Sequence, residues 1–81
     1  MFEYDKEIIG KTIKKIRINR RLSQEVLSSF AGIARSHLSM IENGSKNANF
    51  ETICKIAIAL NMNPHDLVML IEYEYENAQK T

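Results

Sequence analysis

The chain has 81 residues, of which 44% are hydrophobic and 26% are charged, and its formal net charge is +1. This length allows one small domain, and the balance of apolar and charged residues excludes an intrinsically disordered chain. Its longest apolar runs, at 56–60 and 67–71, are too short to cross a bilayer.

Apolar residues recur along the chain at spacings of three and four, which predicts amphipathic helices. The first helix is expected over about 5–19. A second, short helix is expected over about 24–30, with Ser23 as its N-cap. Gly32 comes just past this helix, where a left-handed conformation costs glycine nothing.

Three further helices are expected over about 34–42, over 50–60 after Asn49 as N-cap, and from Pro64 onward. Asn61 is expected to close the fourth helix in a left-handed conformation. The apolar stripes of these helices contain Leu38 and Ile41, then Phe50, Ile53, Ile56, Ala57 and Leu60, then Leu67, Leu70 and Ile71. Because no segment alternates as a half-buried strand does, the sequence predicts an all-α fold and one domain over 1–81.

The segment 24–43 combines two short helices and a glycine turn, the arrangement that places a second helix in a DNA major groove. The outer side of the helix over 34–42 carries Arg35, Ser36, Ser39 and Met40, with His37 at its flank. Such a face suits an approach to phosphates and base edges, although a merely solvated face is the other interpretation.

The small net charge hides a gradient along the chain. Residues 1–50 carry nine basic and five acidic side chains, whereas residues 51–81 carry two basic and five acidic ones. A basic front and an acidic rear would orient the molecule toward a polyanion, although two solvated faces of a helical bundle would give the same gradient.

Residues 9–70 resemble the Cro/phage-repressor family of helix-turn-helix regulators, also called XRE-like. The resemblance rests on an ordered set of short motifs kept without a gap: Ile9-Gly10-Lys11, Ile13-Lys14-Lys15-Ile16-Arg17, Leu22-Ser23-Gln24-Glu25, Leu27, Ala31-Gly32-Ile33, Arg35-Ser36, Leu38-Ser39, Ile41-Glu42-Asn43-Gly44, Glu51-Thr52, Lys55-Ile56-Ala57, Ala59-Leu60 and Leu67. It implies a five-helix, lambda-repressor-like domain and a DNA-binding transcription regulator. The stretch Arg35-Ser36-His37, followed by Lys46-Asn47, also resembles the controller proteins of restriction–modification systems, although His37 stands where tyrosine is usual.

The resemblance assigns roles by position. The residues expected to read bases are Arg35, Ser36, His37, Ser39 and Met40, and those expected to hold phosphates are Gln24, Asn43, Ser45, Lys46 and Asn47. Arg17 and Glu42 are expected to form a buried structural ion pair.

A homodimer is expected, because one such domain reads about half a site and a two-fold dimer spans two half-sites. The fifth helix has more apolar residues than one inward stripe requires. We therefore expect helix 5 and its tail, 64–81, to form the dimer interface together with the loop before that helix. The residues expected in this interface are Leu67, Val68, Met69, Leu70 and Ile71.

The sequence departs from the family pattern at three places. Ala34 stands where Ser or Thr usually caps the recognition helix, and Ala48 replaces a common proline. Val26 and Phe30 lie one turn apart where polar residues are more usual, and we expect Phe2 or Tyr4 to cover them, although a site for a partner is the other interpretation.

Other function classes find little support in the sequence. His37 and His65 have no metal-ligand spacing, and there is no carboxylate pair, phosphate loop or catalytic triad, so no metal, cofactor, small-molecule ligand or enzymatic activity is expected. The single Cys54 excludes an internal disulfide and no signal peptide is present, so we expect a cytoplasmic protein without a membrane partner. The remaining alternative is a protein-interaction module of the same fold, an antitoxin or adaptor, with little DNA binding.

Overall fold

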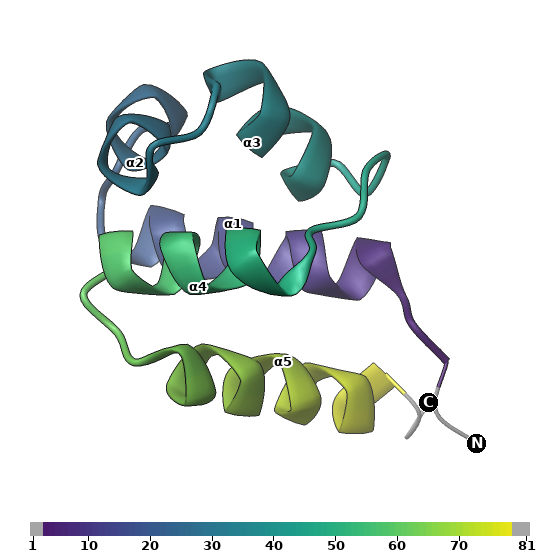
Figure 1. Ribbon diagram of the computed structural model, residues 1–81. Helices are drawn as coiled ribbons and strands as arrows, with labels where there is room; N and C mark the ends of the chain where they lie inside the picture. Colours follow the sequence, from purple (N-terminus) through teal and green to yellow (C-terminus); the bar gives the residue numbers. More distant parts are fainter. Residues whose placement is uncertain (1–2, 79–81) are drawn as a thin grey trace.

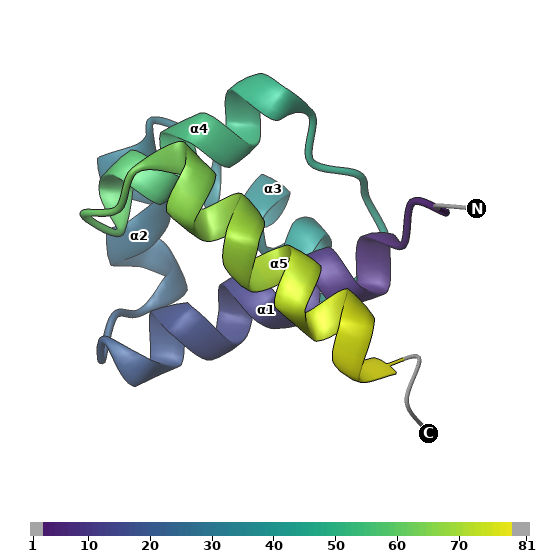
Figure 2. The same ribbon diagram turned by 90° about the horizontal axis from the view of Figure 1, so that it is seen from below.

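The computed structural model describes residues 3–78, which contain five helices and no strand. In chain order these are α1 (Lys6–Asn19), α2 (Gln24–Ala31), α3 (Arg35–Glu42), α4 (Phe50–Ala59) and α5 (Pro64–Ala78). Figure 1 shows three layers, with α2 and α3 on one side of the pair α1 and α4, and with α5 on the other side. The view from below in Figure 2 shows α5 crossing this middle pair. The all-α, five-helix prediction is confirmed.

Side-chain caps begin the first four helices except α3. Asp5 Oδ1 accepts hydrogen bonds from the Glu7 and Ile8 amides, at 2.9 and 3.3 Å. Ser23 Oγ accepts one from the third residue of α2, at 3.1 Å, and Asn49 Oδ1 accepts one from the third residue of α4, at 2.8 Å. Each bond satisfies an amide that has no partner within its own helix.

Left-handed residues close the turns that follow α2 and α4. Gly32 has a φ of 70° and Asn61 has a φ of 60°, as the sequence predicts for both positions. Arg21, in the turn after α1, is also left-handed, with a φ of 59°.

The core lies where the layers meet. Its largest fully buried side chains are Ile13, Leu27, Leu38, Ile41, Ile56, Leu60 and Leu67. The helix α1 packs on α3 and α5, and α2 packs on α3 and α4. Burying each side chain of this size stabilises the folded state by about 1.5–3 kcal/mol. Because Leu38 and Ile41 belong to this core, it holds α3 from its inner side.

One close approach fixes the position of α3 on α1. A Cβ placed on Gly10 would lie 1.9 Å from the carbonyl oxygen of Ile41, far inside van der Waals contact. Glycine is therefore required at this crossing, because any side chain would push the two helices apart.

Three expectations about apolar residues are wrong. Phe50 and Leu70 do not join the inward stripes of their helices, since they are 71% and 41% exposed. Val26 and Phe30 are uncovered, because Tyr4 lies against the α3–α4 loop instead, where its hydroxyl donates to a backbone carbonyl. Phe2, the other residue expected to cover them, lies outside the described residues.

Over residues 3–78, none of the helices combines the length and hydrophobicity that a membrane span needs.

Candidate nucleic-acid interface

The α2–α3 unit is two short helices joined by a tight glycine turn. Gly32 donates its amide to Ser29 O at 3.2 Å, and the Ile33 amide bonds Ser28 O at 3.0 Å. These bonds satisfy carbonyls at the end of α2, and the left-handed Gly32 then reverses the chain into α3. The turn thereby sets the angle at which α3 leaves α2.

The recognition-helix candidate α3 is apolar on one side only. Leu38 and Ile41 are buried, and Arg35, Ser36 and Met40 are exposed on the other side. Ser39 is half-buried. Figure 1 shows α3 at the outer edge of the molecule, with no other element beyond it. This face is free to approach a ligand.

The one acidic residue of α3 is withdrawn from that face. Glu42 is buried at the end of α3, and Arg17 donates to it from Nε at 2.7 Å and from Nη2 at 3.0 Å. Gln24 Nε2 adds a third hydrogen bond at 2.9 Å. The predicted Arg17–Glu42 pair is therefore present, and it joins α1, α2 and α3.

Arg17 also ties this cluster to the turn before α2. Its Nη1 donates to the carbonyl of Leu22 at 2.7 Å. One buried guanidinium thus holds both the end of α3 and the entry to α2. Because a planar guanidinium offers a fixed fork of donors, lysine would not reproduce these contacts.

The loop from 43 to 49 lies beside the exposed face of α3. Asn43, Ser45, Lys46 and Asn47 are all exposed there. The amides of Ser45 and Lys46 donate to the Met40 carbonyl, at 3.0 and 3.2 Å, so the first half of the loop is fastened to α3. The expected phosphate-holding residues of this loop therefore adjoin the expected base-reading ones.

His37 occupies a different place from the other base-reading candidates. It is half-buried and lines a hollow of about 480 Å³ together with Tyr4, Lys46 and Asn47. It lies at the border between α3 and the loop. This position places the imidazole nearer to the phosphate-holding candidates than a position on the outer face would.

The five residues expected in a dimer interface divide into two groups. Leu67 and Ile71 lie in the core of the protomer, at 0% and 7% exposure, so their side chains are not available to a partner. Val68, Met69 and Leu70 are exposed. The division follows from the helical period, because residues four apart share a face.

Sequence reasoning missed one exposed apolar residue next to this helix. Ile58 of α4 is 68% exposed. It lines a hollow together with Met62, which precedes α5, and Asp66, which lies in the first turn of α5. Asp66 lies three and four residues before Met69 and Leu70, on the same side of α5. Ile58 could have been found from its position away from the apolar stripe of α4.

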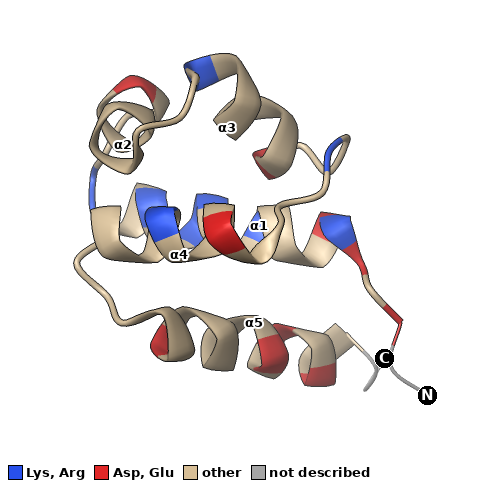
Figure 3. Cartoon of the chain, in the orientation of Figure 1, with Lys and Arg blue, Asp and Glu red and all other residues tan. Residues whose placement is uncertain are grey.

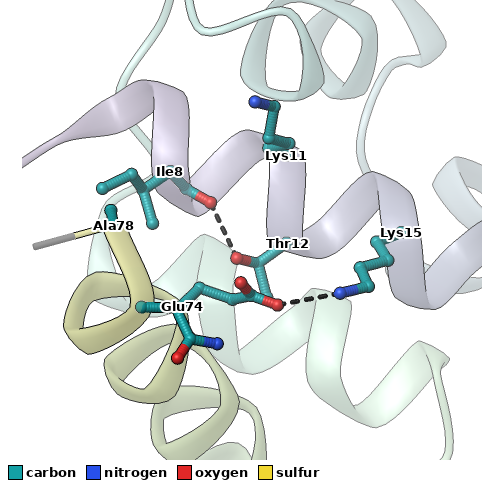
Figure 4. Close-up of a pocket in the computed structure, with 7 residues that line it drawn as sticks. Ile8, Lys11, Thr12, Lys15, Glu74 and Ala78 are labelled. Atoms are coloured by element: carbon teal, nitrogen blue, oxygen red, sulfur yellow. Dashed lines mark hydrogen bonds and ion pairs between the residues drawn. The ribbon is translucent and has the colours of Figure 1, made fainter. Parts of the chain in front are cut away.

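A third open pocket lies on the other side of α1, away from α3. Figure 4 shows it between α1 and the end of α5, where Lys15 Nζ and Glu74 Oε1 are 3.0 Å apart. Thr12 Oγ1 donates to the Ile8 carbonyl at 2.7 Å in its floor. The lysine side of the ion pair is largely exposed, so the pair adds little stability. The pocket contains no reactive group.

Within residues 3–78 no cluster of three His, Cys, Asp or Glu side chains could hold a metal ion.

Charge is distributed unevenly over the elements. Figure 3 shows basic residues on α1, α4 and the start of α3, and only acidic ones on α5. The acidic residues of α5 are Asp66, Glu72, Glu74 and Glu76. The layer that carries the candidate interface is therefore farthest from the acidic layer.

Two short helices around a glycine turn, with a polar outer face on the second, define a helix-turn-helix protein. Comparisons with known proteins agree. The family model described as helix-turn-helix matches residues 13–67. The chain belongs to the XRE-like helix-turn-helix family.

Its relatives include control proteins of restriction–modification systems. The chain is 34% identical to the control protein C.BamHI of Bacillus amyloliquefaciens over 75% of its own length and 76% of that protein. It is 34% identical to the ImmF control region 10 kDa protein of Bacillus phage phi105, over 80% of this chain and 72% of that one.

A solved structure with the same fold is the restriction-modification controller protein C.AhdI from Aeromonas hydrophila. Its TM-score to this chain is 0.74, at 33% identity, covering 78% of this chain and 96% of that one. The resemblance noted in the sequence to XRE-like regulators and to controller proteins is thereby confirmed.

Proposed function

We propose that this protein is a homodimeric transcription regulator that binds double-stranded operator DNA by placing α3 in the major groove. The observation that carries the proposal is the outer face of α3, which exposes Arg35, Ser36 and Met40 while the helix's one carboxylate, Glu42, is buried and paired. An accessible carboxylate on this face would repel phosphates. Its withdrawal leaves a surface that suits a polyanion.

The side chains of α3 are proposed to divide the recognition between them. Arg35 is the candidate for a bidentate contact to guanine O6 and N7, and Ser36, Ser39 and Met40 would contact neighbouring base edges. The position of His37 beside the loop favours a contact at the edge of the groove. Gln24, Asn43, Ser45, Lys46 and Asn47 would hold phosphates and fix the register.

We propose that the dimer forms through the exposed side of α5. Val68, Met69 and Leu70 supply apolar surface there, and Ile58 extends it onto α4. Two α3 helices related by such a two-fold axis would reach half-sites one helical turn, about 34 Å, apart. Leu67 and Ile71 would support this surface from within the core.

Selection of bound sequences from a random duplex library, followed by fluorescence anisotropy on the selected duplex, tests the proposal. Arg35→Ala should weaken binding to the selected duplex by about 1–3 kcal/mol, roughly five- to 150-fold, and relax the base preference at one position. Lys46→Ala should weaken binding to every sequence and lower the slope of log affinity against log salt by about one. If the protein binds no duplex, or if its affinity does not change with salt, the proposal of a DNA-binding regulator is wrong.

One observation favours the interaction module as a second candidate. Phe30 is 68% exposed on α2, one turn after Val26, which is 39% exposed. A protein partner covering α2 would bury this pair. In that case Phe30→Ser would abolish binding to the protein partner. The wild-type protein would then bind duplex DNA only weakly and without sequence preference.

A further inference from the structure

Two tyrosines connect opposite layers of the protein through the segment before α1. The Tyr75 hydroxyl of α5 accepts a hydrogen bond from the Asp5 amide and donates to the Asp5 carbonyl at 3.3 Å. One residue earlier, the Tyr4 hydroxyl donates to the carbonyl of Ala48, at 3.1 Å. These contacts join α5 to the α3–α4 loop, and Tyr4, Asp5 and Tyr75 all lie outside the 13–67 region that the family model matches.

The loop depends on this connection in its middle. Its first half is fastened to Met40 by the Ser45 and Lys46 amides, and its last residue, Asn49, caps α4. Between these anchors lie Asn47 and Ala48. Within residues 3–78, these two residues make one hydrogen bond, which the Ala48 carbonyl accepts from the Tyr4 hydroxyl.

The tyrosine ring stands beside the groups that the loop would present to DNA. Tyr4 lines the same hollow of about 480 Å³ as His37, Lys46 and Asn47. Ala48, whose carbonyl accepts the hydrogen bond from the Tyr4 hydroxyl, is buried and cannot contact a ligand itself. A displacement of Ala48 would move the adjacent Asn47 and Lys46, because the chain is continuous.

We propose that Tyr4 and Tyr75 form a strap that holds the α3–α4 loop in the geometry that contacts phosphates. Tyr75 fixes the backbone of Asp5 to α5, and Tyr4 then reaches across to fix Ala48. In this proposal both tyrosines are positioning residues, since they act on the loop through the hydrogen bonds that their hydroxyls make to the backbone. The strap rests on the proposed function, and it deepens that function by linking α5, the proposed dimer helix, to a phosphate-binding loop.

The test uses Tyr4→Phe in the full chain, because this change removes the hydroxyl and keeps the ring. The probe is a fluorescein-labelled duplex of random sequence, since phosphate contacts do not depend on sequence. Loss of one net hydrogen bond predicts roughly two- to tenfold weaker binding. The salt slope should fall by about one as the Lys46 contact is lost.

Tyr75→Phe should act in the same direction, and the double variant should lose less affinity than the product of the two single losses. Tyr73→Phe is the matched control, because Tyr73 lies exposed on α5 and takes no part in the strap. Its affinity and salt slope should equal those of the wild type.

A purely structural role for the hydroxyl has a different signature. It would lower the unfolding midpoint of Tyr4→Phe and leave the Kd and salt slope unchanged at a temperature where every variant is folded. That result, or equal binding by Tyr4→Phe and Tyr73→Phe, would overturn the strap while leaving the regulator intact. A wild-type chain that binds no duplex would overturn both proposals.

Discussion

Glu42 is the residue at which three parts of the fold meet. It takes hydrogen bonds from Arg17 of α1 and Gln24 of α2 while ending α3, and it is buried among them. A carboxylate at a helix C-terminus faces the negative end of the helix dipole, so it needs cationic partners. The same cluster removes a negative charge from the candidate DNA surface and holds α3 in place.

Glu42→Ala should lower the free energy of unfolding by about 3–5 kcal/mol, because it leaves the buried Arg17 cation without a partner. Urea denaturation followed by circular dichroism measures this loss. The double replacement Arg17→Met with Glu42→Leu should cost far less, since no buried charge then remains. A loss below about 1 kcal/mol for Glu42→Ala would contradict the structural role of the pair.

At the scale of the elements, α3 starts without a side-chain cap, whereas α1, α2 and α4 each have one. Ala34 occupies its N-cap position in an extended conformation and makes no side-chain hydrogen bond to the helix. The helix has only eight residues, so its stability comes from Leu38, Ile41 and Glu42 on its inner side.

Ala34→Ser should therefore raise the free energy of unfolding by about 0.5–2 kcal/mol, because the hydroxyl would accept an otherwise unpaired amide of the first turn. Thermal unfolding of the two proteins side by side provides the measurement. Ala34→Gly is the control, and it should stabilise less than serine does. A serine variant no more stable than the glycine one would show that the cap does not form.

The crossing of α1 and α3 yields a second prediction at this scale. Gly10→Ala should destabilise by about 3 kcal/mol, at the upper end for overpacking, because its Cβ would meet the Ile41 carbonyl. Gly32→Ala should cost only about 1–2 kcal/mol, since its site has open space and only the left-handed conformation is unfavourable. Chemical denaturation ranks the two, and the reverse order would contradict the close crossing.

The sequence predicts the helices well because their signals are local. Ser23, Gly32, Asn49 and Asn61 act on their own turns, and the apolar period identifies Leu38 and Ile41. The tertiary contacts of Tyr4 and Gly10 escaped prediction. Tyr4 bonds a residue 44 positions away, and Gly10 carries no sign of which helix will cross it.

The same distinction explains the mixed outcome for the candidate site. Burial of the Arg17–Glu42 pair was predicted from the family pattern, whereas the separation of Leu67 and Ile71 from Val68, Met69 and Leu70 depends on the rotation of α5 about its own axis. A run of five apolar residues does not reveal that rotation by itself. Packing against α1 and α4 determines it.

At the scale of the whole molecule, the proposed dimer would bring two acidic helices together. The described part of α5 carries Asp66, Glu72, Glu74 and Glu76 and no basic residue. Like charges repel more strongly at low ionic strength. Added salt should therefore tighten the dimer while it weakens DNA binding, and sedimentation and anisotropy across one salt series would measure these opposite trends.

Met69→Glu should convert the dimer to a monomer, because it places a further charge in the apolar surface. Phe30→Glu is the control, since this residue is as accessible but lies on α2 in the opposite layer. Sedimentation equilibrium distinguishes the two. A dimer that survives Met69→Glu and dissociates with Phe30→Glu would move the interface to α2.

The way α3 is mounted has a consequence for the evolution of this protein. Everything that holds the helix lies on its inner side, in Leu38, Ile41, Glu42 and the glycine beneath it. Arg35, Ser36 and Met40 contribute little to folding, because their side chains stand in solvent. Under the proposed function, substitutions at these three positions would exchange one operator preference for another without a loss of stability. The proposed function would then allow this protein to change its target by changes on the outer side of a single helix.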